Sequence, residues 1–213
     1  MKLFSYVVKY DTGFAPNPFW GFCTLACCKP KIRKSAQKGD WIVGLSEKSK
    51  GNQIIYVMRV DEKLTFDQYF NDKRFSAKIP DFSRKEVIFK CGDNIYKPLP
   101  DGNFQQLRSM HSKENEEDQE QKKKDLEGKY VLISKTFYYF GSKAIPLPKD
   151  FYELKVGRGH KCNFSTDFIK SFLDFIRQHP QGINAPPSIW PKNDDSWKNM
   201  NIGILQTNNE NNL

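Results

Sequence analysis

The sequence contains no apolar run that approaches the roughly 20 residues needed to cross a bilayer as a helix. Its opening segment, MKLFSYVVKYD, carries an early lysine but too short an apolar stretch for a secretory signal peptide. These two absences argue against the membrane-spanning and secreted classes. We therefore expect a protein without a membrane partner that lies inside the cell, in the cytoplasm or, in a eukaryote, the nucleus.

Cysteine is scarce, and its spacing is irregular. The 213 residues include five cysteines, an odd number that favours reduced thiols over a disulfide framework. Cys23, Cys27 and Cys28 lack the two-residue gap of a zinc knuckle, and the other cysteines and the histidines are scattered. We predict no metal site and no cofactor, and we interpret all three clustered cysteines as buried free thiols.

The motifs of several enzyme classes are also missing. The sequence has no GxSxG motif and no paired-carboxylate motif, and KVGRGHK (155–161) lacks the spacing and the following Ser or Thr of a P-loop. A catalytic cysteine would need a neighbouring base, which a sequence cannot show. The polar residues that remain as candidates for catalysis are Asp11, Asp40, Cys23 and His160.

Aromatic residues and positive charge are what the sequence has in excess. Aromatics make up 14% of a chain that is only 38% hydrophobic, so the core must contain many Phe, Tyr and Trp side chains, as in twisted sheets and small barrels. The formal charge is +9, and residues 1–60 hold ten Lys or Arg against three Asp or Glu. This localised excess predicts a polyanionic partner, a nucleotide or nucleic acid. The alternative is a protein that is merely basic.

The hydrophobic pattern predicts one α+β domain, residues 1–182, followed by a Pro- and Asn-rich tail, residues 183–213. Strand–turn–strand pairs without regular βαβ alternation favour a curled, mostly antiparallel sheet or a small barrel with flanking helices. Residues 112–128 are almost free of apolar side chains and are interpreted as a charged, mobile insert, with a solvated helix as the alternative. The predicted strands are 2–10, 40–46, 53–64 and 129–141, and the predicted helices are 30–39, 65–75 and 165–182.

Local signals mark the ends of two of these helices. Thr65 is a predicted N-cap for the helix over 65–75, and Ser165 or Thr166 for the last helix. Pro180 would end the last helix. Its predicted buried face consists of Phe168, Ile169, Phe172, Leu173 and Ile176, which recur at helical spacing.

Two basic segments are candidate phosphate sites. If KPKIRK (29–34) opens a helix, its cations stand beside backbone N–H groups that bind anions, and the predicted ligands are Lys29, Lys31, Arg33 and Lys34. In KVGRGHK, Arg158 could contact phosphate, and His160 could do so or act in acid–base chemistry. The alternatives are a solvated basic face for the first segment and a simple turn for the second.

Aromatic residues near the first basic segment are candidates for stacking on a base. Phe14 and Trp20 lie in an irregular loop with Asn17, where apolar side chains call for an explanation. Tyr139 lies in FYYFG (137–141), a strand whose aromatics face both ways, so two are expected in the core and two could line a pocket. Phe14, Asn17, Trp20 and Tyr139 are the predicted base-binding residues.

Several segments resemble the second of the nucleotide-modification-associated domain families. They are SYVVKYDTGFAPNPFWGFCTLACCKPKIRKSAQKGDWIVGLS (5–46), YVLISKTFYYFGSKAIPLP (130–148) and GRGHKC (157–162). The resemblance covers about residues 4–177 without the charged insert. It implies an association with systems that modify nucleic-acid bases and carries no defined activity. The positions that match the motifs are Asp11, Asn17, Cys23, Thr24, Lys29, Arg33, Gly39, Asp40, Tyr139, Gly141, Arg158 and His160.

A looser likeness concerns residues 39–70. GDWIVGLSEKSKGNQIIYVMRVDEKLTFDQYF is similar to the strand–turn–strand–helix of PUA-like domains, some of which hold a modified base in an aromatic cage. The expected function is therefore a nucleotide or nucleic-acid binding domain that recognises or handles a modified base. One alternative is an enzyme of nucleotide or DNA base modification with Asp11, Cys23 and His160 as its reactive groups. The other is a protein–protein interaction module anchored by tail tryptophans; the sequence does not indicate an oligomeric state.

Overall fold

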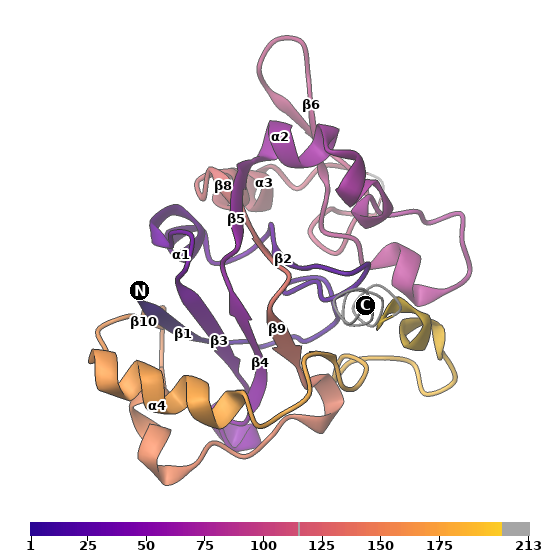
Figure 1. Cartoon of the computed structure of the whole chain (residues 1–213). Helices are drawn as coiled ribbons and strands as arrows, with labels where there is room; N and C mark the ends of the chain where they lie inside the picture. The colour runs from indigo at the N-terminus through magenta and orange to yellow at the C-terminus, as the bar shows by residue number, and fades with distance from the viewer. Residues whose placement is uncertain (115, 202–213) are drawn as a thin grey trace, which may run out of the picture.

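The computed structural model describes residues 1–114 and 116–201 and contains three β-sheets (Figure 1). The largest has the strand order β10-β1-β3-β4-β9-β11, the second has the order β2-β8-β5, and the third is the hairpin of β6 and β7. The strands are β1 Leu3–Val7, β2 Cys23–Leu25, β3 Trp41–Leu45, β4 Ile54–Arg59, β5 Glu62–Thr65, β6 Tyr96–Pro98, β7 Phe104–Gln106, β8 Tyr130–Ser134, β9 Phe137–Tyr139, β10 His160–Lys161 and β11 Gly182–Ile183.

Most strand pairs are antiparallel, as predicted; β1 with β3 and β9 with β11 are parallel. The predicted strands 53–64 and 129–141 each divide between the two larger sheets, which gives β4 with β5 and β8 with β9. The largest sheet runs from β10 to β11 and stays open, so no barrel forms within the described residues. The α+β class is confirmed, and the small barrel is not observed.

Helix α4 (Thr166–Ile176) covers one face of the largest sheet, along which it lies in Figure 1. The Ser165 hydroxyl accepts a hydrogen bond from the Phe168 backbone N–H at 3.2 Å, which confirms the predicted cap. The helix ends at Ile176, before the predicted boundary. Its buried side chains are Ile169, Phe172, Leu173 and Ile176, and they pack with Trp41, Val43 and Val57 of the sheet.

The opposite face of the largest sheet is covered by the loop after β1 and by the C-terminal segment. Tyr6 and Tyr56 lie on this face, with their hydroxyl oxygens 2.8 Å apart. Phe19 of the loop packs against Trp190 of the C-terminal segment, with ring centroids 5.6 Å apart. These contacts hold the loop, which carries the candidate residues Asp11, Phe14, Asn17 and Trp20, against the sheet.

The C-terminal segment begins within the sheet. The predicted domain end at residue 182 lies inside β11, which pairs with β9. Ile183 and Ala185 are buried, and the Ile189 backbone N–H donates to the Asp11 carbonyl at 2.9 Å. The first part of the predicted tail therefore packs on the domain, while residues 202–213 lie outside the described residues.

Helix α2 (Phe66–Asn71) packs against the second sheet. It begins at the predicted cap: the Thr65 hydroxyl accepts from the Gln68 N–H at 3.2 Å, and the Gln68 side chain accepts from the Thr65 N–H at 2.9 Å. Phe66 and Tyr69 are buried between this sheet and the β6–β7 hairpin. The other helices are α1 Pro30–Ser35 and α3 Gln119–Leu126, and the 3₁₀ turns are Lys48–Lys50, Lys73–Lys78, Val87–Lys90, Gly141–Lys143, Lys149–Leu154 and Ser196–Asn201.

The charged segment 112–128 differs from the expected mobile insert. It contains α3, which Asp118 caps by accepting a hydrogen bond from the Gln121 N–H at 2.9 Å. The Asp125 side chain is completely buried and accepts hydrogen bonds from the Cys28 backbone N–H at 2.7 Å and the Tyr96 hydroxyl at 2.8 Å. One inward carboxylate therefore ties the segment to two other parts of the fold.

Replacing Asp125 by Ala should destabilise the fold by about 3–5 kcal/mol, because it leaves buried donors and the nearby Arg33 cation without their partner. Urea unfolding followed by tryptophan fluorescence measures the change. The matched control is Glu120→Ala on the same helix, whose ion pair with Lys124 is exposed to solvent and should contribute little to stability. Equal unfolding midpoints for the two variants would contradict the anchoring role of Asp125.

Candidate functional site

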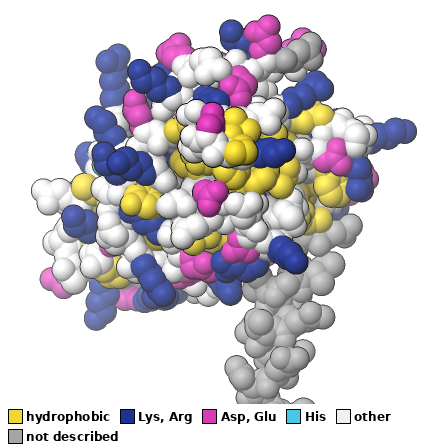
Figure 2. Space-filling view, turned by 90° about the horizontal axis from the view of Figure 1, so that it is seen from above, with side chains coloured by type: hydrophobic (Ala, Val, Ile, Leu, Met, Phe, Trp, Pro, Cys, Tyr) yellow, Lys and Arg dark blue, Asp and Glu magenta, His cyan; other side chains and the backbone are white. Residues whose placement is uncertain are grey.

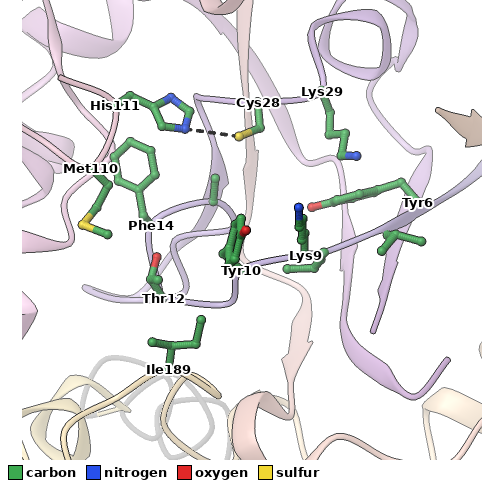
Figure 3. Close-up of a pocket in the computed structure, with 13 residues that line it drawn as sticks. Tyr6, Lys9, Tyr10, Thr12, Phe14, Cys28, Lys29, Met110, His111 and Ile189 are labelled. Atoms are coloured by element: carbon green, nitrogen blue, oxygen red, sulfur yellow. Dashed lines mark hydrogen bonds between the residues drawn. The ribbon is translucent and has the colours of Figure 1, made fainter. Parts of the chain in front are cut away.

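A cavity of about 440 Å³ opens beside the end of β1. The loop after β1, residues 28–29, residues 110–111 and Ile189 line it (Figure 3). Tyr10, Met110 and Ile189 are 65%, 54% and 49% exposed, and they are three of the six large hydrophobic side chains that the described part of the chain exposes. Exposed apolar side chains that gather at one place mark a binding site.

The polar groups of this cavity are cationic. Lys9 and Lys29 line it with His111, and no Asp or Glu is among its described lining residues. The Lys29 ammonium lies 4.7 Å from the centre of the Tyr6 ring, and the Lys9 ammonium lies 5.1 Å from that of Tyr10. Aromatic faces and positive charges therefore share the same wall (Figure 3).

Charge alone does not single out this cavity. Figure 2, which views the molecule from the side of α2 and the β6–β7 hairpin, shows Lys and Arg side chains spread around hydrophobic side chains near the middle of that face. The cationic side chains are thus dispersed over the face that this view shows. The cavity stands out because cations and exposed apolar groups meet there.

Cys28, His111 and Asp125 form a hydrogen-bonded chain at the edge of the cavity. The Cys28 Sγ lies 3.5 Å from His111 Nε2, the contact drawn as a dashed line in Figure 3, and His111 Nδ1 lies 2.6 Å from Asp125 Oδ2. The His111 ring also packs edge-on against Phe14, with centroids 4.8 Å apart. The imidazole is therefore fixed between a thiol and a buried carboxylate.

His111 and Asp125 shift each other's pKa values toward their charged forms. Burial lowers the pKa of His111, but the hydrogen bonds to Asp125 and Cys28 outweigh that effect and raise the pKa to about 9. Burial raises the pKa of Asp125, but the His111 hydrogen bond and the charges of His111 and Arg33 hold it below its usual range. At neutral pH the imidazole is therefore protonated and the carboxylate ionised.

Arg33 does not lie on the rim where a phosphate ligand was predicted. Its side chain is fully buried, and its guanidinium donates to the backbone carbonyls of Cys28 and Tyr130, both at 2.7 Å, and to that of Asp125. A Cβ on Gly128 would lie 2.4 Å from the Arg33 Cζ, so the backbone closes tightly over this group. Arg33 is a structural cation because carbonyls occupy its donors.

The other predicted phosphate ligands are placed differently from one another. Lys29 lines the cavity, and Lys29 and Lys31 line an adjoining hollow of about 450 Å³ that also contains Cys28 and His160. Lys34 and Arg158 are exposed and line neither space. The proposed backbone anion site is not supported: α1 has six residues and opens with Pro30, which has no N–H.

The predicted catalytic residues do not come together in either space. Cys23 is completely buried, and burial raises the pKa of its thiol well above the usual range. Asp11 is buried beneath the C-terminal segment and accepts hydrogen bonds from the hydroxyls of Tyr139 and Ser188. His160 is half-buried on β10, where burial and the charges of the nearby Lys31 and Lys29 lower its pKa.

Of the predicted base-binding residues, Phe14 lines the cavity. Tyr139 is buried with its hydroxyl bound to Asp11, and Asn17 is buried with its amide donating to the Gly13 and Cys91 carbonyls. Trp20 is partly buried and packs edge-on against Phe19. Asn17 and Tyr139 support the loop from inside because their polar groups are satisfied within the core.

Comparison with protein families gives a match to the model described as nucleotide modification associated domain 2, over residues 1–194. The chain belongs to this family. The comparisons with curated proteins and with solved structures gave no match. The nucleotide modification associated domain thus includes the loop after β1, the charged segment with Asp125 and the C-terminal segment up to residue 194.

The likeness to PUA-like domains stays a prediction. Among the helices that the structure describes, none is long and apolar enough to span a membrane.

Most residues of this site are not predicted from the sequence. The sequence predicts a buried thiol at Cys28, whereas Cys28 is partly exposed. His111 directly precedes the predicted insert 112–128, and Asp125 lies within it. The available signal was weak: an intracellular cysteine enzyme often carries its His and Asp far away in the sequence. Here 83 residues separate Cys28 from His111, and 14 separate His111 from Asp125.

A metal ion is the alternative use of these side chains. Donor atoms of Cys27, His111 and Asp125 all lie within 4.8 Å of one another. An ion would have to replace the proton that joins His111 to Asp125 at 2.6 Å, and the Cys27 thiol is directed to the Asp93 carbonyl at 3.8 Å. The donors are thus engaged with other groups, and we do not assign them as metal ligands.

The raised pKa of His111 makes the stability of the nucleotide modification associated domain pH-dependent. Its folded pKa of about 9 exceeds the ordinary histidine value of 6.5, so its contribution to stability is full below pH 6.5 and is lost as pH rises through 9. Between these limits the stability difference between wild type and His111→Gln should shrink by up to about 3 kcal/mol. Urea unfolding at pH 6, 7.5 and 9.5 measures it.

His160→Gln is the matched control. The pKa of His160 is lowered, so its contribution is present above its unfolded pKa and is lost as pH falls through its folded pKa. The difference in unfolding free energy between His160→Gln and wild type should therefore stay constant from neutral pH to pH 9.5. A constant difference for His111→Gln over the same range would contradict the charged imidazole.

Proposed function

We propose that this domain binds a nucleotide, free or within nucleic acid, in the cavity between Tyr10 and His111. The observation that carries this proposal is the wall itself, where exposed apolar side chains meet cations and no Asp or Glu is among the described lining residues. A nucleotide combines an apolar base with an anionic phosphate, and the cavity volume of about 440 Å³ suits a ligand of that size. The family description, with its reference to nucleotide modification, supports the same class of ligand.

The base would stack against the aromatic side of the cavity. Tyr10 is the most exposed aromatic side chain there, and Phe14 lies across from it against His111 (Figure 3). Stacking on an aromatic ring is worth about 1–3 kcal/mol per base. Because stacking tolerates substituents on the base, this wall suits a domain that recognises or handles a modified base.

The phosphate would lie between the cavity and the adjoining hollow. Lys29 lines both spaces, and Lys31 and Lys124 line the second. Asp125 also borders the second hollow, but its charge is compensated by His111 and Arg33. A strand of nucleic acid could continue from one space into the other, with one nucleotide base in the cavity.

The interaction-module alternative is less favoured by the placement of its anchors. Trp190 packs on Phe19, and its indole N–H donates to the Asp194 carbonyl at 2.9 Å. Trp197 also packs against the core of the sheet. Both tryptophans are partly buried and pack against the protein's own core, which favours a role in fastening the C-terminal segment.

Fluorescence anisotropy with labelled oligonucleotides, with and without a modified base, tests the proposal at two salt concentrations. Tyr10→Ala should weaken binding roughly 5- to 150-fold through lost stacking. Lys29→Ala should weaken binding by a similar factor for every sequence. It should also reduce the slope of log affinity against log salt concentration by about one, the amount expected for one lost phosphate contact.

Lys38→Ala is the control, because Lys38 is an exposed lysine outside both spaces. It should leave the affinity within about twofold of wild type. Equal losses for Lys38→Ala and Lys29→Ala, or no binding by the wild-type protein, would refute the assignment of the cavity.

A further inference from the structure

The geometry points to a nucleophilic site in which the Cys28 thiolate, paired with His111 and positioned through Asp125, adds to carbon 6 of a pyrimidine nucleotide. This inference rests on the proposed nucleotide binding and extends it to covalent chemistry. The sulfur atom lies where the two spaces meet, since Cys28 lines both. A base in the cavity would therefore lie beside it.

The order Cys28–His111–Asp125 is that of a nucleophile, a base and an orienting carboxylate. The Cys28 backbone is held on both sides: its N–H donates to Asp125, and its carbonyl accepts from the Arg33 Nε, both at 2.7 Å. Its φ of 61° places it in the left-handed region, which few non-glycine residues adopt. Contacts with Asp125, Arg33 and His111 thus fix the Cys28 thiol at the edge of the cavity.

The other four cysteines lack this setting. Cys23, Cys27 and Cys91 are buried, and burial raises the pKa of each thiol. Cys162 is exposed and lines neither space. Cys28 alone among the cysteines, all of which are described, combines partial exposure, a lining position and an imidazole partner.

The imidazole partner is charged in the resting state. With its pKa at about 9, His111 carries a proton at neutral pH, and its Nε2 lies 3.5 Å from the Cys28 sulfur. Asp125 holds the Nδ1 side of the ring, so that Nε2 faces the sulfur. The other charged or titratable groups that interact with Cys28 or His111 are Asp125, Lys29, Arg33, Cys27, Tyr6 and Tyr56.

A nucleotide offers a thiolate three kinds of electrophilic centre: phosphorus, the sugar C1′ and C6 of a pyrimidine. Attack at phosphorus would bring the phosphate, rather than the base, against the apolar wall of the cavity, whereas Lys31 and Lys124, which are proposed to bind it, border the adjoining hollow. Displacement at C1′ is assisted by a carboxylate near the sugar, and the carboxylate that borders the described lining of these spaces, Asp125, is already held by His111, Tyr96 and the Cys28 N–H. Addition at C6 needs only a thiolate and a proton donor, which the site supplies.

The step balances without any other reagent. The Cys28 sulfur forms a bond to C6, and the electron pair of the C5=C6 bond moves to C5 and the adjoining C4 carbonyl or amidine. His111 then gives its proton to C5 and becomes neutral. In reverse, the neutral imidazole removes a proton from C5, the double bond forms again, and the thiolate leaves. Before C5 receives this proton, the intermediate carries the displaced electron pair at C5, and an otherwise inert carbon is nucleophilic at that stage.

The test uses the full chain and 5-nitro-2′-deoxyuridine 5′-monophosphate, whose nitro group stabilises the carbanion and so traps the adduct. Intact-mass spectrometry should show one added nucleotide, and peptide mapping should place it on Cys28. An excess of dCMP should slow its formation. Cys28→Ser should form no adduct, His111→Gln should form it at least tenfold more slowly, and Cys162→Ser should match wild type.

A second measurement checks the thiolate without any nucleotide. Because the Cys28 sulfur faces the His111 ring, Cys28 should react with iodoacetamide at pH 6.5 about tenfold faster than the exposed Cys162 in the same molecule. His111→Gln should abolish this advantage. Equal rates for the two cysteines in the wild-type protein would overturn the ion pair and the proposal with it.

Binding of the same nitro nucleotide to Cys28→Ser, measured by calorimetry, separates the two proposals. Binding to this variant together with no adduct on wild type overturns the nucleophilic site and leaves nucleotide binding intact. No binding to either protein overturns the proposed function and this inference together.

Discussion

A buried carboxylate is stable only when its charge is compensated and its oxygens are hydrogen-bonded, and in this fold four residues do this for Asp125. Its oxygens bind the Cys28 backbone, the Tyr96 hydroxyl and the His111 ring, while Arg33 lies 4.0 Å away and binds the carbonyl of the same residue. Taking one such charge out of water costs several kcal/mol unless all of these partners are in place. The start of α1, the hairpin and the charged segment are therefore positioned together or not at all.

This demand gives the cavity its chemistry. The same hydrogen bonds that satisfy Asp125 orient His111 and fix the Cys28 backbone, so stability and reactivity have one source. The neighbouring Cys27 shows the contrast: one residue earlier in the chain, its thiol is buried and directed to the Asp93 carbonyl. A local left-handed turn at Cys28 is enough to separate an inert thiol from an exposed one.

The positive charge of the chain serves two different purposes. Arg33 and Lys78 are completely buried and hold loops together by donating to backbone carbonyls, Lys78 to those of Asn17 and Phe22. Lys9 and Lys29 instead reach the cavity over aromatic faces. Counting Lys and Arg along the chain therefore overestimates the cations available to a polyanion, because burial removes some of them from the surface.

Spacing and hydrogen bonds within a few residues are enough to predict the α+β class, the segments that contain β1, β3, β4, β5, β8 and β9, the caps at Thr65 and Ser165, and most of the buried face of α4. The sequence also pointed to Phe14 and Lys29 through their unusual loop. Only the tertiary structure decided that Arg33 faces inward and that Cys28 meets His111 and Asp125. Those contacts join residues up to 97 positions apart, and nothing in the local pattern of a charged segment shows which of its carboxylates will be buried.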